Sequence, residues 1–521
     1  MAVPLPAPGA TPYDASPRSR STPGLFPRPM SVLVQTAGPA TPAHPRGLYT
    51  LFFTEMWERF SYYGMRALLV LFMVDSVRNG LGMTDQVATS IYGLYTAAAY
   101  LAALPGGWVA DRLLGARRSV WYGGMIIAAG HFTLAIPRIE TFYIGLILVV
   151  CGTGLLKPNV SAMVGELYPE GGARRDAGFT VFYMGINLGA TIGPLLCGAL
   201  GERVNWHYGF ALAGVGMVLG LAQYRVTARH LGTAGARPAQ GEATRRRDAL
   251  LLTAAVGSLA LIIAMAAAGA IRINPVTLAR GTTYVIVGVA FLYFLVAFTC
   301  LGLEPVERRR MAVIAVLFVS SAMFWSGFEQ AGSTLNLFAD RYTQRVLAGF
   351  NIPASWFQSF NPAFIIALAP VVAAIWLVLA RGNRNPSLPV KFATGLILLG
   401  GGFLVMACAA KLVGGGQKVG PTWLIATYLL HSVGELCLSP IGLSSVTKLA
   451  PKRLVGQMMG IWFLATSLGN LIAGLFAGEM SAAGPDQMTG RYLQIVLTTV
   501  GTGVLLLVFT RPIKRLMAGV E

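Results

Sequence analysis

The sequence is poor in charged residues and has no paired cysteines. Only 12% of its 521 residues are Asp, Glu, Lys or Arg, whereas soluble domains average about 25%. This deficit excludes an ordinary soluble protein. The five cysteines stand singly within apolar segments and form no CxxC pair. Neither a metal cluster nor a disulfide framework is therefore predicted, and we expect no metal site.

The motifs of nucleotide-driven pumps and membrane hydrolases are also missing. No GxxxxGK[ST] loop occurs, and GGGQKVG (Gly414–Gly420) lacks its spacing. There is no HExxH or GxSxG motif, and no span pairs a nucleophile with a base. We therefore predict that the chain is not an enzyme and has no catalytic residues and no cofactor.

Long apolar stretches are what the sequence has in abundance. It is 55% hydrophobic, with a mean hydropathy of +0.62, and stretches of bilayer-spanning length recur along it. This pattern predicts an all-α polytopic membrane protein. Fourteen spans are expected, at about 48–74, 87–111, 118–136, 141–165, 177–199, 207–226, 249–271, 282–303, 311–338, 361–380, 391–411, 421–447, 455–478 and 492–510.

Lys and Arg are distributed unequally between the two sides of these spans. With the N-terminus placed in the cytoplasm, cytoplasmic segments hold 27 of them and the opposite loops hold 10. This split fits the positive-inside rule and predicts that both termini are cytoplasmic. Because the net charge of +19 is spread over short loops rather than one patch, no nucleic-acid partner is expected.

The spans group as six, an extra pair and six more. The first residues hold 11 of the 29 prolines, a composition that cannot build a core. We predict a disordered Pro-rich cytoplasmic tail (1–46), an N-terminal six-helix bundle (47–228), a cytoplasmic linker with an inserted transmembrane pair (229–305), a C-terminal six-helix bundle (306–515) and a C-terminal tail (516–521).

Seven ionisable residues lie deep inside the predicted spans. Such groups usually face the bundle interior or a watery cavity and mark substrate or ion pathways. In the first span, helical spacing puts the charged residues on one face with two tyrosines. Structural ion pairs alone are a poor explanation, because buried pairs stabilise less than apolar packing. The seven are Glu55, Glu58, Arg59, Arg66, Lys157, Glu329 and Glu435.

Two motifs resemble those of a known transporter family. GGWVADRLLGARRS (Gly106–Ser119) resembles the G-xxx-D-R-x-x-G-x-R-R signature of the major facilitator superfamily. TEMWERFSYYG (Thr54–Gly64) is similar to the E-xx-E-R-F-x-Y-Y-G motif of its proton-dependent oligopeptide transporter family, in the bacterial type. The stretches GLLKPNVSAMVGELY, FTVFYMGINLGATIGP, FEQAGSTLNLFADR, FNPAF and GELCLSPIGLSSVTKLAP fit the same family.

The resemblance implies a major facilitator fold and the import of di- and tripeptides with protons by alternating access. Arg59, Lys157 and Tyr63 would hold the peptide carboxylate, and Glu435 would receive its ammonium. The implied substrate-binding residues are Arg59, Tyr62, Tyr63, Tyr100, Lys157, Asn187, Asn361, Glu435 and Trp462.

The resemblance also implies residues for coupling and gating. Glu55, Glu58 and Glu329 would serve proton coupling, and Arg66 with Glu329 would form a gating salt bridge. Animal members carry a coupling histidine where this chain has Gly93, which leaves coupling to the carboxylates. The conformational motif would comprise Asp111, Arg112, Arg117 and Arg118.

The expected partners are peptides, protons and the lipid bilayer, for a monomer in the bacterial inner membrane. Two alternatives stay open from the sequence. One is a transporter of another small solute, such as nitrate or a peptidomimetic, and the other is a membrane receptor that transports nothing. The motif around Glu58 together with Glu435 favours a zwitterion over a simple anion.

Overall fold

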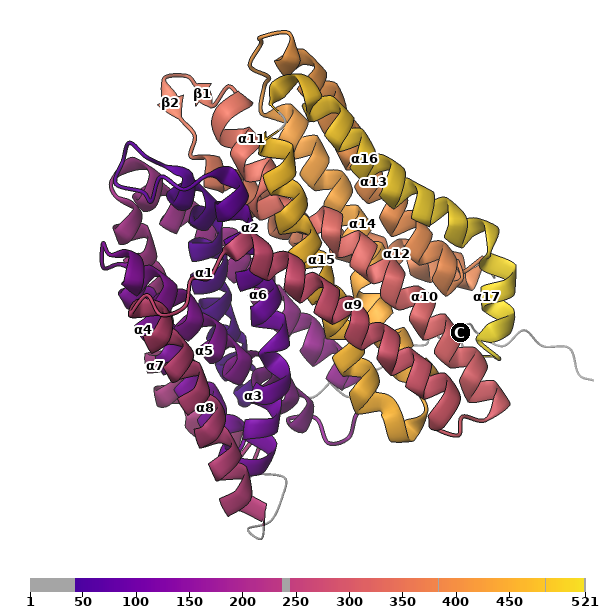
Figure 1. Cartoon of the computed structure of the whole chain (residues 1–521). Coiled ribbons are helices and arrows are strands. Elements are labelled where there is room, and N and C mark those ends of the chain that lie inside the picture. Colours follow the sequence, from indigo (N-terminus) through magenta and orange to yellow (C-terminus); the bar gives the residue numbers. More distant parts are fainter. Residues whose placement is uncertain (1–42, 237–243, 383, 483, 520–521) are drawn as a thin grey trace, which may run out of the picture. The chain divides into compact units, whose positions relative to one another are not determined.

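The computed structural model describes residues 43–236, 244–382, 384–482 and 484–519, most of which are helical (Figure 1). The predicted N-terminal tail lies outside the described residues up to position 42, as does part of the predicted linker (237–243). The division into domains therefore stays a prediction.

The helices that precede the linker form the first bundle. Its centre is α1, which packs against α6 and α7, while α4 packs against α5. The second predicted span is one rod with a break near Ala102 and a π-helical turn at its end. The elements are α1 (Arg46–Val74), α2 (Asp85–Leu101), α3 (Ala103–Val109), η1 (Ala110–Leu114), α4 (Ala116–Leu134), α5 (Ile139–Glu166), α6 (Gly172–Arg203), α7 (Trp206–Thr227) and η2 (Ala228–Leu231).

The second bundle repeats this plan. Its helix α13 packs against α14 and α16, and α10 packs against α15. A short antiparallel hairpin pairs Leu347 with Phe350. The elements are α10 (Pro305–Phe328), η4 (Glu329–Gly332), α11 (Thr334–Tyr342), β1 (Val346–Leu347), β2 (Phe350–Asn351), η5 (Ala354–Ser359), α12 (Phe360–Arg381), α13 (Leu388–Gly414), α14 (Thr422–Leu449), η6 (Lys452–Leu454), α15 (Val455–Ala482), α16 (Pro485–Val508) and α17 (Thr510–Leu516).

The inserted pair consists of α8 (Arg245–Ala267) and α9 (Pro275–Cys300). Figure 1 shows α9 running obliquely past α2 and α15, and it contacts both of these helices. Its small residues Ala279, Ala290 and Ala297 are buried in that contact zone. In contrast, α8 buries only Asp248 among its described residues. The pair therefore reaches both bundles through α9.

Twelve helices of the described residues are long and apolar enough to cross a membrane. The two predicted spans not among them are α1 and α4. Every membrane-length window of α1 holds at least three of its charged residues, and Arg117 and Arg118 occupy the first turn of α4. An all-α polytopic fold is confirmed, whereas the count of fourteen spanning helices stays a prediction.

Close approach between α2 and α15 brings the two bundles together. A Cβ atom at Gly93 would lie 3.1 Å from the Cα of Gly474, and Ser467 donates a hydrogen bond to the Ala97 carbonyl at 3.2 Å. Small residues at a helix interface allow such approach, which drives helix association in a membrane. A larger side chain at position 93, histidine included, does not fit without separating these helices.

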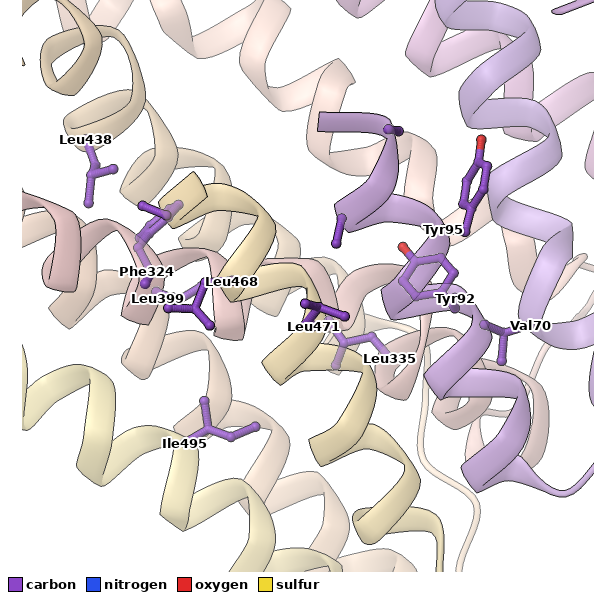
Figure 2. Packing of buried hydrophobic residues seen from close by; sticks show 14 of the residues in the cluster. Val70, Tyr92, Tyr95, Phe324, Leu335, Leu399, Leu438, Leu468, Leu471 and Ile495 are labelled. Atoms are coloured by element: carbon purple, nitrogen blue, oxygen red, sulfur yellow. The ribbon is translucent and has the colours of Figure 1, made fainter. Parts of the chain in front are cut away.

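Large apolar side chains fill the space around this contact. Figure 2 shows Tyr92 of α2 near Leu471 of α15 and Leu335 of α11, with Tyr95 further along the same helix. These side chains are at most 4% exposed. The cluster therefore extends from one bundle to the other.

Candidate functional site

A cavity of about 290 Å³ is lined by residues of both bundles. The first bundle contributes α1, α2, α5 and α6, and the second contributes α10, η4, η5, α12, α14 and α15. This size suits a small molecule. The predicted site residues that line it are Glu55, Arg59, Tyr63, Arg66, Tyr100, Lys157, Asn187, Glu329, Asn361, Glu435 and Trp462.

On α1, one arginine lies between two carboxylates. The Arg59 Nε atom is 3.1 Å from a Glu55 oxygen and 2.5 Å from a Glu58 oxygen. All three side chains are almost completely buried. Since two buried carboxylates face one cation, a bound proton or a second cation would balance the group. The polar stripe predicted from helical spacing is therefore present.

Lys157 is a further cation of the first bundle and lines the cavity. Its ammonium lies 4.2 Å from the centre of the Tyr100 ring, and it forms no ion pair with another described residue. The position is half-buried in α5, directly before Pro158. A cation held mainly by an aromatic face can still accept an anionic partner.

Glu435 is the corresponding carboxylate of the second bundle. Asn361 donates a hydrogen bond to one of its oxygens at 3.2 Å and another to the Ser432 hydroxyl at 3.0 Å. Among the described residues, no cation pairs with Glu435. The cavity thus contains an unpaired cation from one bundle and an unpaired carboxylate from the other.

Arg66 and Glu329 connect the bundles beside the cavity. Their charged atoms are 2.5 Å apart, and both side chains are at most 7% exposed. Arg66 also donates to the hydroxyl of Tyr92 at 2.6 Å. This ion pair is the predicted bridge, and it joins α1 to η4.

Hydrogen bonds also join the two bundles at the end of the molecule where α1 ends. We call this end the α1-end face; it carries residues 75–84, 203–205 and 343–353. Arg341 binds Asp85 through two bonds of 2.5 and 2.7 Å. The Glu202 carboxylate accepts bonds from the backbone of Ala354 and Ser355, each at 2.8 Å. These contacts join the two bundles at that face.

Two of the predicted binding and coupling residues do not line the cavity. The Tyr62 ring stacks on Tyr95 with ring centres 6.0 Å apart, and it is 5% exposed. Glu58 lies behind Arg59 and is fully buried. Whether either acts in binding or coupling stays a prediction.

The cavity includes residues that were not predicted. Trp325 and Phe328 lie within four residues of Glu329, and Phe463 directly follows Trp462. Their closeness in sequence to predicted site residues could have been used to predict them. His431 is another of the unpredicted residues: it is 1% exposed, packs on Phe403 with ring centres 4.8 Å apart and also lines the cavity. The further unpredicted polar residues are Tyr183, Gln358, Tyr428, Ser439 and Thr466.

The predicted conformational motif lies away from the cavity. Arg112 pairs with Asp248 of α8 at 3.3 Å. Arg117 donates to the carbonyls of Gly232 and Ala234 at 2.5 and 2.6 Å. Asp111 and Arg118 are exposed. The two partnered arginines of the motif thus hold the linker and the first inserted helix.

A polytopic helical fold around a cavity lined by both cations and carboxylates is typical of a membrane transporter of the major facilitator type. The chain belongs to the POT family, because the model of that family (PTR2) matches residues 117–490. It is 44% identical over 487 residues to the "Peptide transporter YePEPT" of Yersinia enterocolitica, covering 91% of this chain and 95% of that one.

Further similarities support the same assignment. The "Di-/tripeptide transporter" of Lactococcus lactis subsp. cremoris is 38% identical over 495 residues, covering 92% of this chain and 97% of its own. A crystal structure of a peptide transporter POT in complex with sulfate matches with a TM-score of 0.85 and 42% identity. That match covers 91% of this chain and 96% of the other.

Proposed function

We propose that this protein imports di- and tripeptides together with protons by alternating access. The observation that carries the proposal is the pair of unpaired charges in one cavity, Lys157 from the first bundle and Glu435 from the second. A short peptide is a zwitterion, so its two ends need a cation and a carboxylate. The names of the relatives, peptide and di-/tripeptide transporters, support the same substrate class.

The peptide carboxylate would bind Lys157 and Arg59, with Tyr63 at the same end. The ammonium would bind Glu435, which Asn361 already holds in place, with Asn187 beside it. Tyr100 and Trp462 line the remaining wall, and Tyr62, which stacks on Tyr95, lies outside the lining. Held at both ends, peptides with different side chains fit the same aromatic cavity.

Protons, rather than a metal or an organic cofactor, would drive uptake. Glu55 and Glu58 both pair with Arg59, so a proton on one carboxylate would leave the arginine with a single anionic partner and favour its binding of a substrate carboxylate. A proton on Glu329 would weaken its bond to Arg66 and loosen the contact between the bundles. Binding of the proton then favours one conformation over the other. No covalent bond is made in this cycle, so we propose no enzymatic activity.

The α1-end face would be the periplasmic side, closed in this conformation by Arg341 and Glu202. This orientation follows from the Lys and Arg distribution and puts both termini in the cytoplasm. The protein would work as a monomer in the bacterial inner membrane.

Uptake by proteoliposomes tests the proposal. Purified protein is reconstituted, a pH gradient (acid outside) is imposed, and accumulation of a labelled dipeptide is measured with and without a protonophore. Di- and tripeptides should compete, whereas tetrapeptides and nitrate should not. Competition by nitrate instead would indicate transport of another solute, and binding without accumulation would indicate a receptor.

A further inference from the structure

Arg66 has a second partner besides Glu329. Its Nε atom donates to the phenolic oxygen of Tyr92 at 2.6 Å, while Nη2 lies 2.5 Å from Glu329. The guanidinium carbon is also 5.6 Å from the centre of the Tyr92 ring. Tyr92 is completely buried on α2 and does not line the cavity. A buried hydroxyl needs a hydrogen-bond partner, and Arg66 provides it.

Tyr92 also touches the segment that carries Glu329. Gly332 ends the short helix η4 that begins at Glu329, and a Cβ atom at position 332 would collide with the Tyr92 hydroxyl. The hydroxyl therefore lies between the guanidinium and this segment. Its own position is fixed by α2, because the next residue, Gly93, packs directly on Gly474 of α15.

We propose that Tyr92 is a positioning residue for the Arg66–Glu329 bridge. Two hydrogen bonds fix the orientation of the planar Arg66 guanidinium. The bond from Nε to the Tyr92 hydroxyl therefore orients Nη2 toward Glu329. When the bridge opens, the same hydroxyl keeps Arg66 beside α2, ready to pair again. The effect of Tyr92 on transport rests on the proposed function. Its effect on the orientation of Arg66 does not.

A double-mutant cycle tests the geometry without any transport assay. Tyr92→Phe removes one oxygen atom, Glu329→Gln removes the charge at the other end, and thermal unfolding of the purified full-length protein in detergent is measured. We expect Tyr92→Phe to lower the midpoint by about 2 °C or more in the wild-type background and by less than half as much beside Glu329→Gln. Additive shifts would overturn the inference.

Tyr95→Phe is the matched control. Tyr95 lies on the same helix, is 4% exposed and has a buried hydroxyl without a hydrogen-bond partner among the described residues. Its replacement should change the midpoint equally in both backgrounds. Coupling of the same size for Tyr95 would mean that the cycle reports general packing of α2, which would also overturn the inference.

A transport measurement tests the second part. In proteoliposomes, Tyr92→Phe should lower the maximal rate of dipeptide uptake by about tenfold and leave KM within about twofold, because the substrate contacts are unchanged. Tyr95→Phe should change neither. An unchanged maximal rate would overturn the role in transport. If the wild-type protein does not transport peptides, the proposed function is wrong. The double-mutant cycle would still test whether Tyr92 positions Arg66.

Discussion

At the scale of single residues, the most informative feature is the group around Arg59. Three charges are buried within one helix turn, at distances of 2.5 and 3.1 Å. Taking charges out of water costs several kcal/mol for each ion, so ion pairing alone is a weak reason to keep them. The cavity gives a better reason, because Arg59 and Glu55 line it.

Replacing Glu58 tests coupling apart from binding. It is fully buried behind Arg59 and does not line the cavity. We expect Glu58→Gln to lower gradient-driven uptake by about tenfold or more and to leave peptide counterflow within about twofold, because only the driven reaction needs a proton. Equal losses in the two assays would mean that Glu58 serves binding or folding.

Much of this residue-level picture could be predicted from the sequence. The helical period placed Glu55, Arg59 and Arg66 on one face, and they line one cavity. Tyr92 could not be found this way, since its bond to Arg66 joins two helices. A tyrosine inside an apolar span has no local signal that separates it from Tyr95, whose hydroxyl has no partner among the described residues.

At the scale of the elements, the contact between α2 and α15 sets how closely the bundles approach. A Cβ atom at Gly93 would lie 3.1 Å from the Asn470 carbonyl oxygen and from the Gly474 Cα. Gly93→Ala should therefore destabilise the fold by about 1–3 kcal/mol and lower the thermal midpoint, since backbone atoms must move apart.

Gly257→Ala is the matched control for this variant. Gly257 lies within α8, and a Cβ atom added there would meet no heavy atom of the described residues within 4 Å. Alanine at this position should leave the midpoint unchanged or raise it slightly, because it favours helix. A midpoint for Gly93→Ala no lower than that of the control would contradict the close-packing account.

The connection between α6 and η5 leads to a further prediction. The side chain of Glu202 is 5% exposed and accepts bonds from Ala354 and Ser355 of the other bundle. These hydrogen bonds must break when the α1-end face opens. With the native cysteines replaced, a cysteine at the cavity residue Ser439 can be labelled by an impermeant reagent from outside. Glu202→Gln should raise that labelling rate by about threefold or more.

Glu170→Gln provides the control for this measurement. Glu170 is exposed and pairs with Arg174 one turn away on the surface. Its replacement should leave labelling unchanged. An unchanged rate for Glu202→Gln would mean that these bonds do not hold the α1-end face closed.

The helices could be predicted from the sequence, whereas the contacts between them could not. Each predicted span contains a helix, because length and hydropathy are local properties. The contact of Glu202 with η5 and the pairing of Arg112 with Asp248 join segments distant in sequence. Neither contact is indicated by a pattern in the local sequence. The oblique path of α9 against both bundles was also beyond prediction from its apolar composition.

At the scale of the whole molecule, the cavity combines charges from two bundles that are separate in sequence. Lys157 and Glu435 are each the only charged residue in the middle of their helices, and only the fold brings them to one cavity. If the bundles rock against each other, the two ends of a bound peptide would be held by different bundles. A zwitterion of suitable length would then link substrate occupancy to the change of conformation.

Inhibition by N-acetylated peptides tests whether Glu435 binds the ammonium end of the peptide. Uptake of a labelled dipeptide is measured against increasing amounts of an unmodified dipeptide and of its N-acetylated form, in wild-type protein, Glu435→Gln and the control Glu479→Gln, an exposed residue. The account predicts that Glu435→Gln raises the half-inhibitory concentration of the unmodified peptide by about tenfold and leaves that of the acetylated peptide within about twofold. Equal weakening of both peptides, or of neither, would contradict it.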